Sequence, residues 1–482
     1  MAETHWKLLE EARNLGRSDQ KRETLMAYCH LLFLYPEVAE AWAEYGGLLL
    51  SINEVEGALT AFSKCLALDP GSLPALIGVG RALLRSGQLE EAKFRLEQAL
   101  SVDPQLTEVR LDLARCGWKQ GNLDQALGVL APVLAQEPDH PDLPDYLIAI
   151  YIRQENWPAV HREMLRRVDR EYSGAEWEWE HFVVNMLFGA MSEGWAQHEA
   201  RFGHPAIRTP MRSFPEPLWR GEPLENRTLL LHWEQGFGDT LMFVRYAPMV
   251  KRLGARVLLL AQPELAGLVA TCPGVDEVVA EGGPLPPFDL HLPLLSLPHR
   301  FQTDLDSIPS QTPYLDVPAC VPNRGGISEC LAKGQDHVRI GIAWAGSPIH
   351  PRDSERSVPP ETFRPLQALP NVSWHALQPG ILELPPLPGL VSLAPFLSNF
   401  SDTAFALRGM DLVITVDSAM AHLAGALGIP TLLLVSYLPD WRWMMGRVDS
   451  PWYPTMRIYR QADPGDWGPV IERVLADLSS VG

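Results

Sequence analysis

At 482 residues, the chain is too long for a single hydrophobic core and suits about two to four domains. Its apolar fraction of 46% and charged fraction of 21% are those of a folded globular protein and exclude a disordered one. The formal net charge of −19 argues against a nucleic-acid-binding protein, because phosphate contacts need a basic face, and it disfavours binding to anionic lipid.

The sequence shows no sign of export or membrane insertion. Residues 1–10 contain no basic segment followed by a long apolar run, so no signal peptide is predicted. The longest apolar runs, such as 257–261 and 431–435, have the length of strands and are too short to span a bilayer. The 6 cysteines form no CxxC pair, which disfavours zinc and favours a reducing compartment. We therefore expect a cytoplasmic protein with no metal site and no membrane span.

A period of 34 residues runs through the first part of the chain. The residues that keep it are prolines (Pro36, Pro70, Pro104, Pro138), small residues (Ala12, Gly46, Gly80, Ala114) and large apolar residues (Tyr28, Phe62, Leu96, Leu130). In tetratricopeptide repeats, small residues let paired helices approach closely and a proline ends the second helix. We predict an α-solenoid over 1–174, with full repeats at about 5–38, 39–72, 73–106 and 107–140 and a weaker fifth near 141–174.

Stacked helical hairpins form a superhelix whose concave face commonly receives a peptide or another protein. The alternative is an array that only supports the rest of the chain or pairs it into a homo-oligomer. After the array, residues 175–226 are predicted to form a helical cap, with a helix near 193–202, and then a proline-rich linker.

From residue 227 the pattern changes to alternating strands and helices, which predicts two α/β lobes. We assign an N-terminal lobe to 227–326 and a C-terminal lobe to 327–482, joined through a proline-rich stretch at 282–326. Ligands of such sheets bind at the carboxyl ends of the strands. The predicted elements are strands at 228–233, 256–260, 338–344, 373–377, 412–416 and 431–435 and helices at 240–253 and 421–427.

The first candidate motif is the turn between the first predicted strand and its helix. It contains the candidate site residues Gly236, Gly238, Asp239 and Thr240. Glycines there allow a tight turn and a close approach of a ligand to the backbone. Asp239 stands at the helix start, where aspartate is a favoured N-cap. The residues alone leave both a cap and a catalytic base open, and the two roles are compatible.

The second motif is a strand-to-helix turn in the C-terminal lobe. Asp417, Ser418, Ala419 and Met420 lie at the start of a helix, whose free N–H groups and dipole suit a diphosphate. Asp417 and Ser418 are equally plausible as caps. His422, one turn into the helix, either contacts a phosphate or is a core histidine with its hydrogen bonds satisfied.

A third motif, Trp344, Gly346 and Ser347 with Arg356 after it, leaves another strand of the C-terminal lobe. The small residues would admit a phosphate and the arginine would offer it paired donors. Because exposed arginines are common on loops, this motif indicates little by itself.

The fourth motif is Asp-Trp-Arg-Trp at 440–443, in which Arg442 would serve a phosphate and the rings would stack on a base or sugar. Core packing is the commoner fate of tryptophan. The DxD sequence at 304–306 has the form of a divalent-metal site, but it lies in a polar loop with no clear strand before it. We interpret it as a chance occurrence.

Taken together, these motifs resemble a known family. Residues 227–475 resemble the heptosyltransferase-like glycosyltransferases of family nine, which have the two-lobed GT-B fold. The resemblance is carried by segments 234–240, 342–346, 416–423 and 440–443. Repeats in front of such a module are typical of bacterial tetratricopeptide proteins with a glycosyltransferase domain.

The resemblance implies an inverting transfer without a metal. Asp239 is then the general base, and Asp417, Ser418 and His422 hold a nucleotide-sugar donor, which is a substrate and not a cofactor. Helix-start amides and arginine would meet the charge of the departing diphosphate. We expect the acceptor to be a protein held by the repeats. Two alternatives are a non-catalytic scaffold with a degenerate nucleotide-sugar module, and an enzyme acting on lipid or polysaccharide acceptors.

Overall fold

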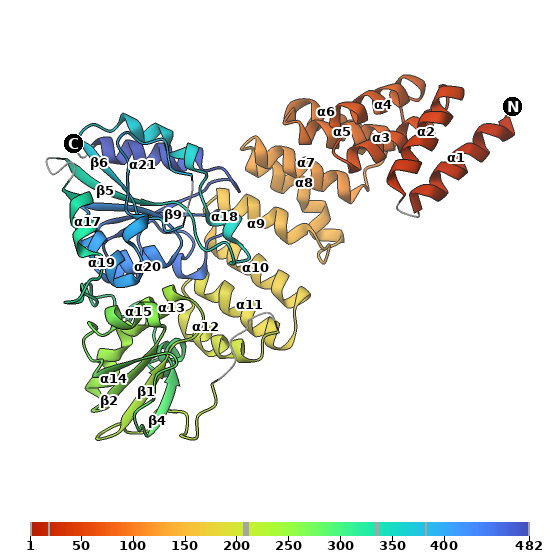
Figure 1. The fold of residues 1–482 in the computed structure, drawn as a ribbon. Coiled ribbons are helices and arrows are strands. Elements are labelled where there is room, and N and C mark those ends of the chain that lie inside the picture. The colour runs from red at the N-terminus through yellow and green to blue at the C-terminus, as the bar shows by residue number, and fades with distance from the viewer. Residues whose placement is uncertain (1, 18–19, 206–211, 333–336, 381–382, 481–482) are drawn as a thin grey trace. The chain divides into compact units, whose positions relative to one another are not determined.

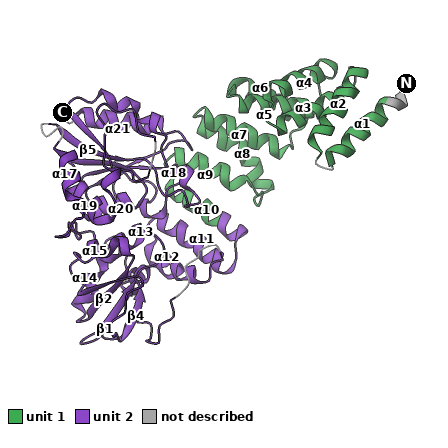
Figure 2. Cartoon of the chain, in the orientation of Figure 1, with its two compact units in different colours: residues 1–166 green, residues 167–482 purple. Residues whose placement is uncertain are grey.

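The computed structural model of the chain describes residues 2–17, 20–205, 212–332, 337–380 and 383–480. Its contacts divide the chain into two compact units, one up to residue 166 and one from residue 167 (Figure 2). Part of the predicted linker, residues 206–211, lies outside the described residues, as do residues 18–19 of the first predicted repeat.

The first unit consists of helical hairpins, so the prediction of N-terminal helical repeats is confirmed. A Cβ atom on Gly46 would lie 2.7 Å from the ring of Phe62, and one on Gly80 would lie 2.6 Å from Leu96. The small and large periodic residues are thus partners across one hairpin. The helices are α1 (Ala2–Arg17), α2 (Lys21–Leu34), α3 (Ala39–Ser51), α4 (Val55–Leu68), α5 (Leu73–Arg85), α6 (Leu89–Val102), α7 (Thr107–Lys119), α8 (Leu123–Gln136) and α9 (Leu143–Arg153). Helix α10 (Trp157–Glu171) contains the boundary between the two units.

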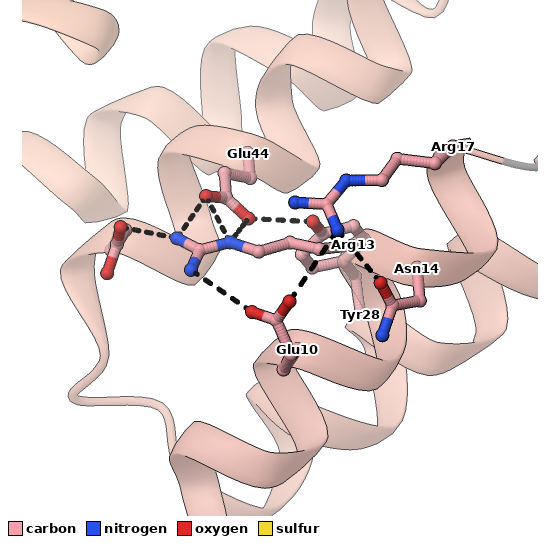
Figure 3. Close-up of polar contacts among 7 residues, drawn as sticks. Glu10, Arg13, Asn14, Arg17, Tyr28 and Glu44 are labelled. Atoms are coloured by element: carbon pink, nitrogen blue, oxygen red, sulfur yellow. Dashed lines mark hydrogen bonds and ion pairs between the residues drawn. The ribbon is translucent and has the colours of Figure 1, made fainter.

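Charged side chains connect the first helices of neighbouring repeats. Figure 3 shows Arg13 of α1 reaching Glu44 of α3, with Nη2 and Oε1 2.6 Å apart, while Tyr28 of α2 donates to the other carboxylate oxygen. The same spacing of 31 residues recurs between α5 and α7, where Arg81 Nε donates to Asp112 at 2.6 Å. These contacts fix the stacking of successive repeats within the unit.

After the end of α10, the second unit continues with a helical hairpin, where the sequence predicted one helix near 193–202. Helix α11 (Gly174–Leu187) pairs with α12 (Met191–His198), and the 3₁₀ helix η1 (Glu199–Phe202) follows. We call residues 174–202 the cap. Trp195 and Phe182 are fully buried in it, which is why it folds as a part of this unit.

The first lobe is built on a parallel sheet in the order β3-β2-β1-β4. Its strands are β1 (Thr228–His232), β2 (Arg256–Ala261), β3 (Glu277–Ala280) and β4 (Leu290–Pro293). The predicted helix over 240–253 was wrong at its start, because α13 (Phe237–Phe243) begins three residues earlier; it continues through η2 (Val244–Tyr246) into α14 (Ala247–Arg252). Strand β4 lies inside the stretch predicted to separate the lobes, and α15 (Pro263–Val269), η3 (Leu294–Ser296) and α16 (Leu297–Arg300) complete the lobe.

The second lobe is built on a parallel sheet in the order β10-β9-β8-β5-β6-β7. The strands are β5 (Val338–Ala343), β6 (Val372–Ala376), β7 (Val391–Ser392), β8 (Leu412–Val416), β9 (Thr431–Val435) and β10 (Met456–Arg460). The helices are α17 (Arg324–Leu331), α18 (Asp353–Arg356), α19 (Phe400–Arg408), α20 (Ala419–Ala426) and α21 (Gly468–Ser480), and the 3₁₀ helices are η4 (Pro360–Ala368), η5 (Ala394–Phe396) and η6 (Trp441–Trp443). Two parallel sheets confirm the predicted two-lobed α/β module.

The lobes contact each other through helices that follow their strands: α13 packs on α20, and α15 packs on α19 (Figure 1). Arg245 of η2 is buried in this contact. Its Nη1 donates to the carbonyl of Trp452 at 2.6 Å, its Nη2 donates to the hydroxyl of Tyr314 at 2.8 Å, and its guanidinium lies over the ring of Tyr453. A cation is thus held entirely inside the interface between the lobes.

Candidate active site

The turn after β1 closes on itself through Asp239. Gly236 is the N-cap of α13, and Asp239 stands in the first turn, where its Oδ2 accepts the N–H of Gly236 at 3.0 Å. This satisfies one of the donors that a helix start leaves open. The capping role considered from the sequence is therefore present, although Asp239 is inside the helix and not at the N-cap position.

The other carboxylate oxygen of Asp239 forms an ion pair with Arg442 of the second lobe. Arg442 belongs to η6, just after β9, and its Nη1 also donates to Asp440 at 2.8 Å. The side chains of Asp239 and Arg442 are each 12% exposed. The carboxyl ends of β1 and β9 thus meet at a charged pair shielded from most of the solvent, where electrostatic interactions are strong.

Backbone strain flanks this pair on both sides. Gln235 has a φ of 46° and Met444 a φ of 51°, a region that residues other than glycine rarely adopt. Such conformations persist only when the surrounding structure enforces them, and they cluster at functional sites. Both loops that bring Asp239 and Arg442 together are therefore held in a fixed, strained shape.

A second loop, after β5, places Arg356 beside Gly346. The N–H of Gly346 donates to Ser357 Oγ at 3.1 Å, and Arg356 Nε donates to Asp353 at 3.2 Å. A Cβ atom on Gly346 would lie 2.5 Å from Arg356 Nη2, so only glycine lets the guanidinium lie there. Ser347 is exposed at the next position. The predicted third motif is thus a folded cationic loop.

Helix α20 begins at the carboxyl end of β8 with Ser418 as its N-cap. The Ser418 hydroxyl accepts the N–H of Met420 at 3.3 Å, while Ala419 opens the helix. The charge of Asp417 lies next to those of Asp440 and Arg442. The predicted diphosphate turn and the Arg442 loop are therefore neighbours.

Desolvation, together with the negative charge of Asp440, raises the pKa of Asp417 from 3.8 to about 6. An acid whose pKa is higher in the folded protein than in the unfolded chain makes folding less favourable as the pH rises between the two values. We therefore expect Asp417→Asn to raise the free energy of unfolding by about 1 kcal/mol above pH 6. This is less than the full pKa shift implies, because the residue is partly exposed and solvent screens its charge.

Thermal unfolding of both proteins between about pH 4 and pH 8 would measure this effect. The stabilisation should vanish towards the acid end, where Asp417 is protonated in the folded and unfolded states alike. A difference that does not change with pH would contradict the raised pKa.

Several predicted site residues have their side chains in the protein interior. The Thr240 hydroxyl donates to Gln262 at 2.8 Å. Trp344 packs in the core of the second sheet. His422 shares a hydrogen bond with the Tyr453 hydroxyl at 2.9 Å, and burial lowers its pKa well below 6.5, so it is neutral. A Cβ atom on Gly238 would lie 2.8 Å from the His422 ring. These residues shape the contact between α13 and α20.

Arg201 of the cap, which the motifs did not predict as a site residue, has a fully buried side chain. It forms an ion pair with Glu234 at 3.1 Å, and it donates to Ser296 Oγ at 2.7 Å and to Glu199 at 2.9 Å. Glu234 is the first residue of the motif that contains Asp239. Glu234 was the available sequence signal, because it is a charged residue that follows an apolar strand. A charged side chain in such a buried position needs a buried partner of opposite charge.

The cap also contacts the loop that carries Arg442. Rings of the cap lie edge-on to Trp441, with centroids 5.2 Å away for Phe182 and 5.5 Å away for Trp195. The N–H of Met445 donates to the carbonyl of Leu187 at 2.8 Å. One helical hairpin therefore supports both halves of the Asp239–Arg442 pair.

The DxD sequence at 304–306 forms a local turn, in which Asp304 Oδ1 accepts the N–H groups of Asp306 and Ser307. Within the part of the chain that the structure describes, no group of three or more His, Cys, Asp or Glu side chains is placed to hold a metal ion. Within the same residues, no helix combines the length and the apolar character needed to cross a bilayer.

Comparison with known proteins agrees with the first unit. The tetratricopeptide repeat family matches residues 49–104 and 84–150. The chain carries tetratricopeptide repeats. Protein FlbA of Caulobacter vibrioides is 25% identical to the chain over 324 residues, which cover 61% of the chain and 54% of FlbA. The chain thus spans about half the length of this curated relative.

Two solved structures are similar to parts of the chain. A glycosyl transferase of family 9 from Veillonella parvula DSM 2008 has a TM-score of 0.42 at 12% identity, covering 54% of this chain and 98% of its own. PilW, a type IV pilus biogenesis factor, has a TM-score of 0.36 at 19% identity, covering 41% of this chain and 91% of its own.

Proposed function

We propose that the second unit is an inverting, metal-independent glycosyltransferase that moves a sugar from a nucleotide-sugar donor to an acceptor hydroxyl. The observation that carries the proposal is the Asp239–Arg442 pair at the carboxyl ends of β1 and β9. Strand ends of α/β sheets are where ligands bind, and a carboxylate beside a cation there suits acid–base chemistry on an anionic substrate. In the reaction, Asp239 takes the proton of the acceptor hydroxyl as its oxygen attacks the anomeric carbon.

The donor diphosphate would lie between the start of α20 and the arginines. Helix α20 offers free N–H groups at its first turn, next to Ser418, and the dipole of the helix favours an anion there. Arg356 beside Gly346 and Arg442 beside Asp440 supply positive charge from two other loops. These groups would stabilise the charge that the diphosphate acquires as it leaves.

We propose a protein as the acceptor, held by the repeats. Stacked repeats form an extended concave surface that commonly receives a peptide or another protein. The first helices of the repeats carry paired charges, such as Arg13 with Glu44 and Arg81 with Asp112, which suit a polar peptide.

A non-catalytic scaffold is the second candidate function, and one observation favours it. Asp239 caps its own turn by accepting the N–H of Gly236, and that contact needs no reaction to explain it. Under this interpretation, the charged pair with Arg442 only holds the lobes together.

A thermal-shift screen of the full chain against nucleotide sugars and nucleoside diphosphates, with and without a chelator, would separate the two functions. A donor at a hundredfold excess over its dissociation constant should stabilise the fold by about 2.7 kcal/mol. Stabilisation by one nucleotide class, followed by sugar transfer to a protein captured with the repeats, would support the enzyme. No response to any nucleotide would favour the scaffold.

Ser418→Arg is expected to abolish nucleotide-sugar binding, because the long side chain would fill the space at the start of α20. Ser418→Ala is the matched control: it loses the cap and about 1 kcal/mol of stability, yet it leaves the space open. Isothermal titration calorimetry of both variants with the donor found in the screen would test this. Unaltered binding in Ser418→Arg would place the donor elsewhere.

A further inference from the structure

Arg442 has donors in two directions. Its Nη2 forms the ion pair with Asp239, and its Nη1 donates to Asp440 at 2.8 Å. Its Nε is buried and, among the described residues, has no hydrogen-bond partner. Buried donors in folded proteins are nearly always satisfied, so an orphaned one at a candidate site indicates an acceptor atom that arrives with a ligand.

The position of the Arg442 side chain does not depend on Asp239 alone. Asp440 holds the guanidinium from one side, and the ring of Trp441 lies 4.3 Å from its central carbon. Trp441 is itself fixed against Trp195 of the cap. When Asp239 loses its charge, Arg442 therefore remains in place with a positive charge that is no longer balanced by that carboxylate.

We propose that Arg442 is a further catalytic residue, which couples proton abstraction by Asp239 to departure of the donor diphosphate. This inference rests on the proposed glycosyl transfer. The O–H bond of the acceptor breaks, and its proton goes to a carboxylate oxygen of Asp239. The acceptor oxygen bonds to the anomeric carbon, whose bond to the diphosphate oxygen breaks, and the electron pair leaves with the diphosphate.

The charges around Arg442 make this coupling useful. In that single step Asp239 changes from anion to neutral acid, while the diphosphate gains one negative charge. The guanidinium of Arg442 thus loses Asp239 as an anionic partner and gains the diphosphate. In the proposal, its Nε donates to the diphosphate. A charge that is already in place when the anion forms stabilises the transition state without reorganisation. Lysine could not replace Arg442. A guanidinium directs several N–H donors from one rigid plane, whereas the ammonium group of lysine is a single centre of charge.

The first experiment measures kcat and donor affinity in the full chain for Asp239→Asn, Arg442→Gln and the double variant. Arg442→Gln should lower kcat about 10²-fold to 10³-fold, and Arg442→Lys should recover little of it. The double variant should be no slower than Asp239→Asn alone, because the two residues act as a unit. Arg447→Gln is the matched control: Arg447 lies in the same loop but pairs with Asp449, so its removal should leave kcat unchanged.

The second experiment needs no activity. We expect Asp239→Asn to bind a nucleoside diphosphate about tenfold more tightly than the wild-type chain, because Arg442 is released from its ion pair. The same substitution in an Arg442→Gln background should not tighten binding. Calorimetric titration with UDP, GDP, ADP, CDP and dTDP gives the readout, and circular dichroism confirms that each variant is folded.

The outcomes separate this inference from the proposed function. Multiplicative losses of kcat in the double variant, or tightening of diphosphate binding that persists without Arg442, would overturn the coupling while the transferase stands. A wild-type chain that transfers no sugar would overturn the proposed function. In that case, tightening that depends on Arg442 would still support the exchange of partners at this residue.

Discussion

Asp239→Asn is expected to lower kcat for sugar transfer by about 10³-fold or more, because an amide cannot take the proton of the acceptor hydroxyl. Asparagine has the size of aspartate, and its carbonyl oxygen can still accept the N–H of Gly236 that the carboxylate accepts at 3.0 Å. The turn should keep its shape, and donor binding should not weaken. Steady-state kinetics and donor titration on one preparation would measure both quantities.

Asp276→Asn is the matched control for this substitution. Asp276 also accepts a backbone N–H, from Val257 at 2.8 Å, and pairs with Lys251, but it lies at the start of β2 and β3, the opposite end of the strands. It should leave transfer intact. If Asp239→Asn unfolded the protein while Asp276→Asn did not, capping would be the better account of Asp239 and its role as a base would lose its support.

Arg201→Met is expected to have a large effect on stability and to lower the free energy of unfolding by about 3–5 kcal/mol. The substitution leaves the carboxylate of Glu234 buried, with a side chain only 4% exposed, and removes its cation. An uncompensated buried charge is far more costly than the loss of an exposed ion pair. Because Glu234 leads into the turn of Asp239, donor binding should weaken together with stability. Chemical denaturation, with tryptophan fluorescence as the signal, would give the change in stability.

Two further variants would identify the buried charge as the cause. Adding Glu234→Gln to Arg201→Met removes the stranded carboxylate and should recover a large part of the stability. Arg256→Met removes an exposed pair with Glu277 in the same lobe and should cost about 1 kcal/mol or less. Equal costs for Arg201→Met and Arg256→Met would mean that the cap does not depend on this ion pair.

The repeats could be predicted from the sequence because the same contact recurs in each period: a small residue of one helix packs against a large apolar residue of the next. Strands β8 and β9 were predicted at their observed bounds because each is a run of apolar and β-branched residues followed by a turn. Strand β4 was not, since Leu290–Pro293 is too short to show a period and lies among prolines. The early start of α13 was hidden by Gly236 and Gly238, which are poor helix formers; the capping contact from Asp239 overrides that preference.

Individual residues of the candidate site could be predicted from the sequence, but the contacts between them could not. Asp239 and Arg442 were each singled out from local motifs, as a base and as a phosphate ligand. Their ion pair joins positions 203 residues apart on different lobes, and no local pattern encodes such a contact. The support from the cap was invisible for the same reason, because Arg201 meets Glu234 only after two separate elements have folded together.

The buried Arg245 constrains how substrates reach the site. A hinge motion that swung the lobes apart would pull its guanidinium from the Trp452 carbonyl and the Tyr453 ring and leave the cation with fewer partners. Breaking such a buried cation from its partners costs several kcal/mol, too much to repeat at every turnover without compensation. In the proposed transferase, entry and product release should therefore depend on the loop that carries Arg356, which would move as a flap over a rigid frame. The turnover rate of the proposed transferase would then be set by this flap rather than by closure of the two lobes.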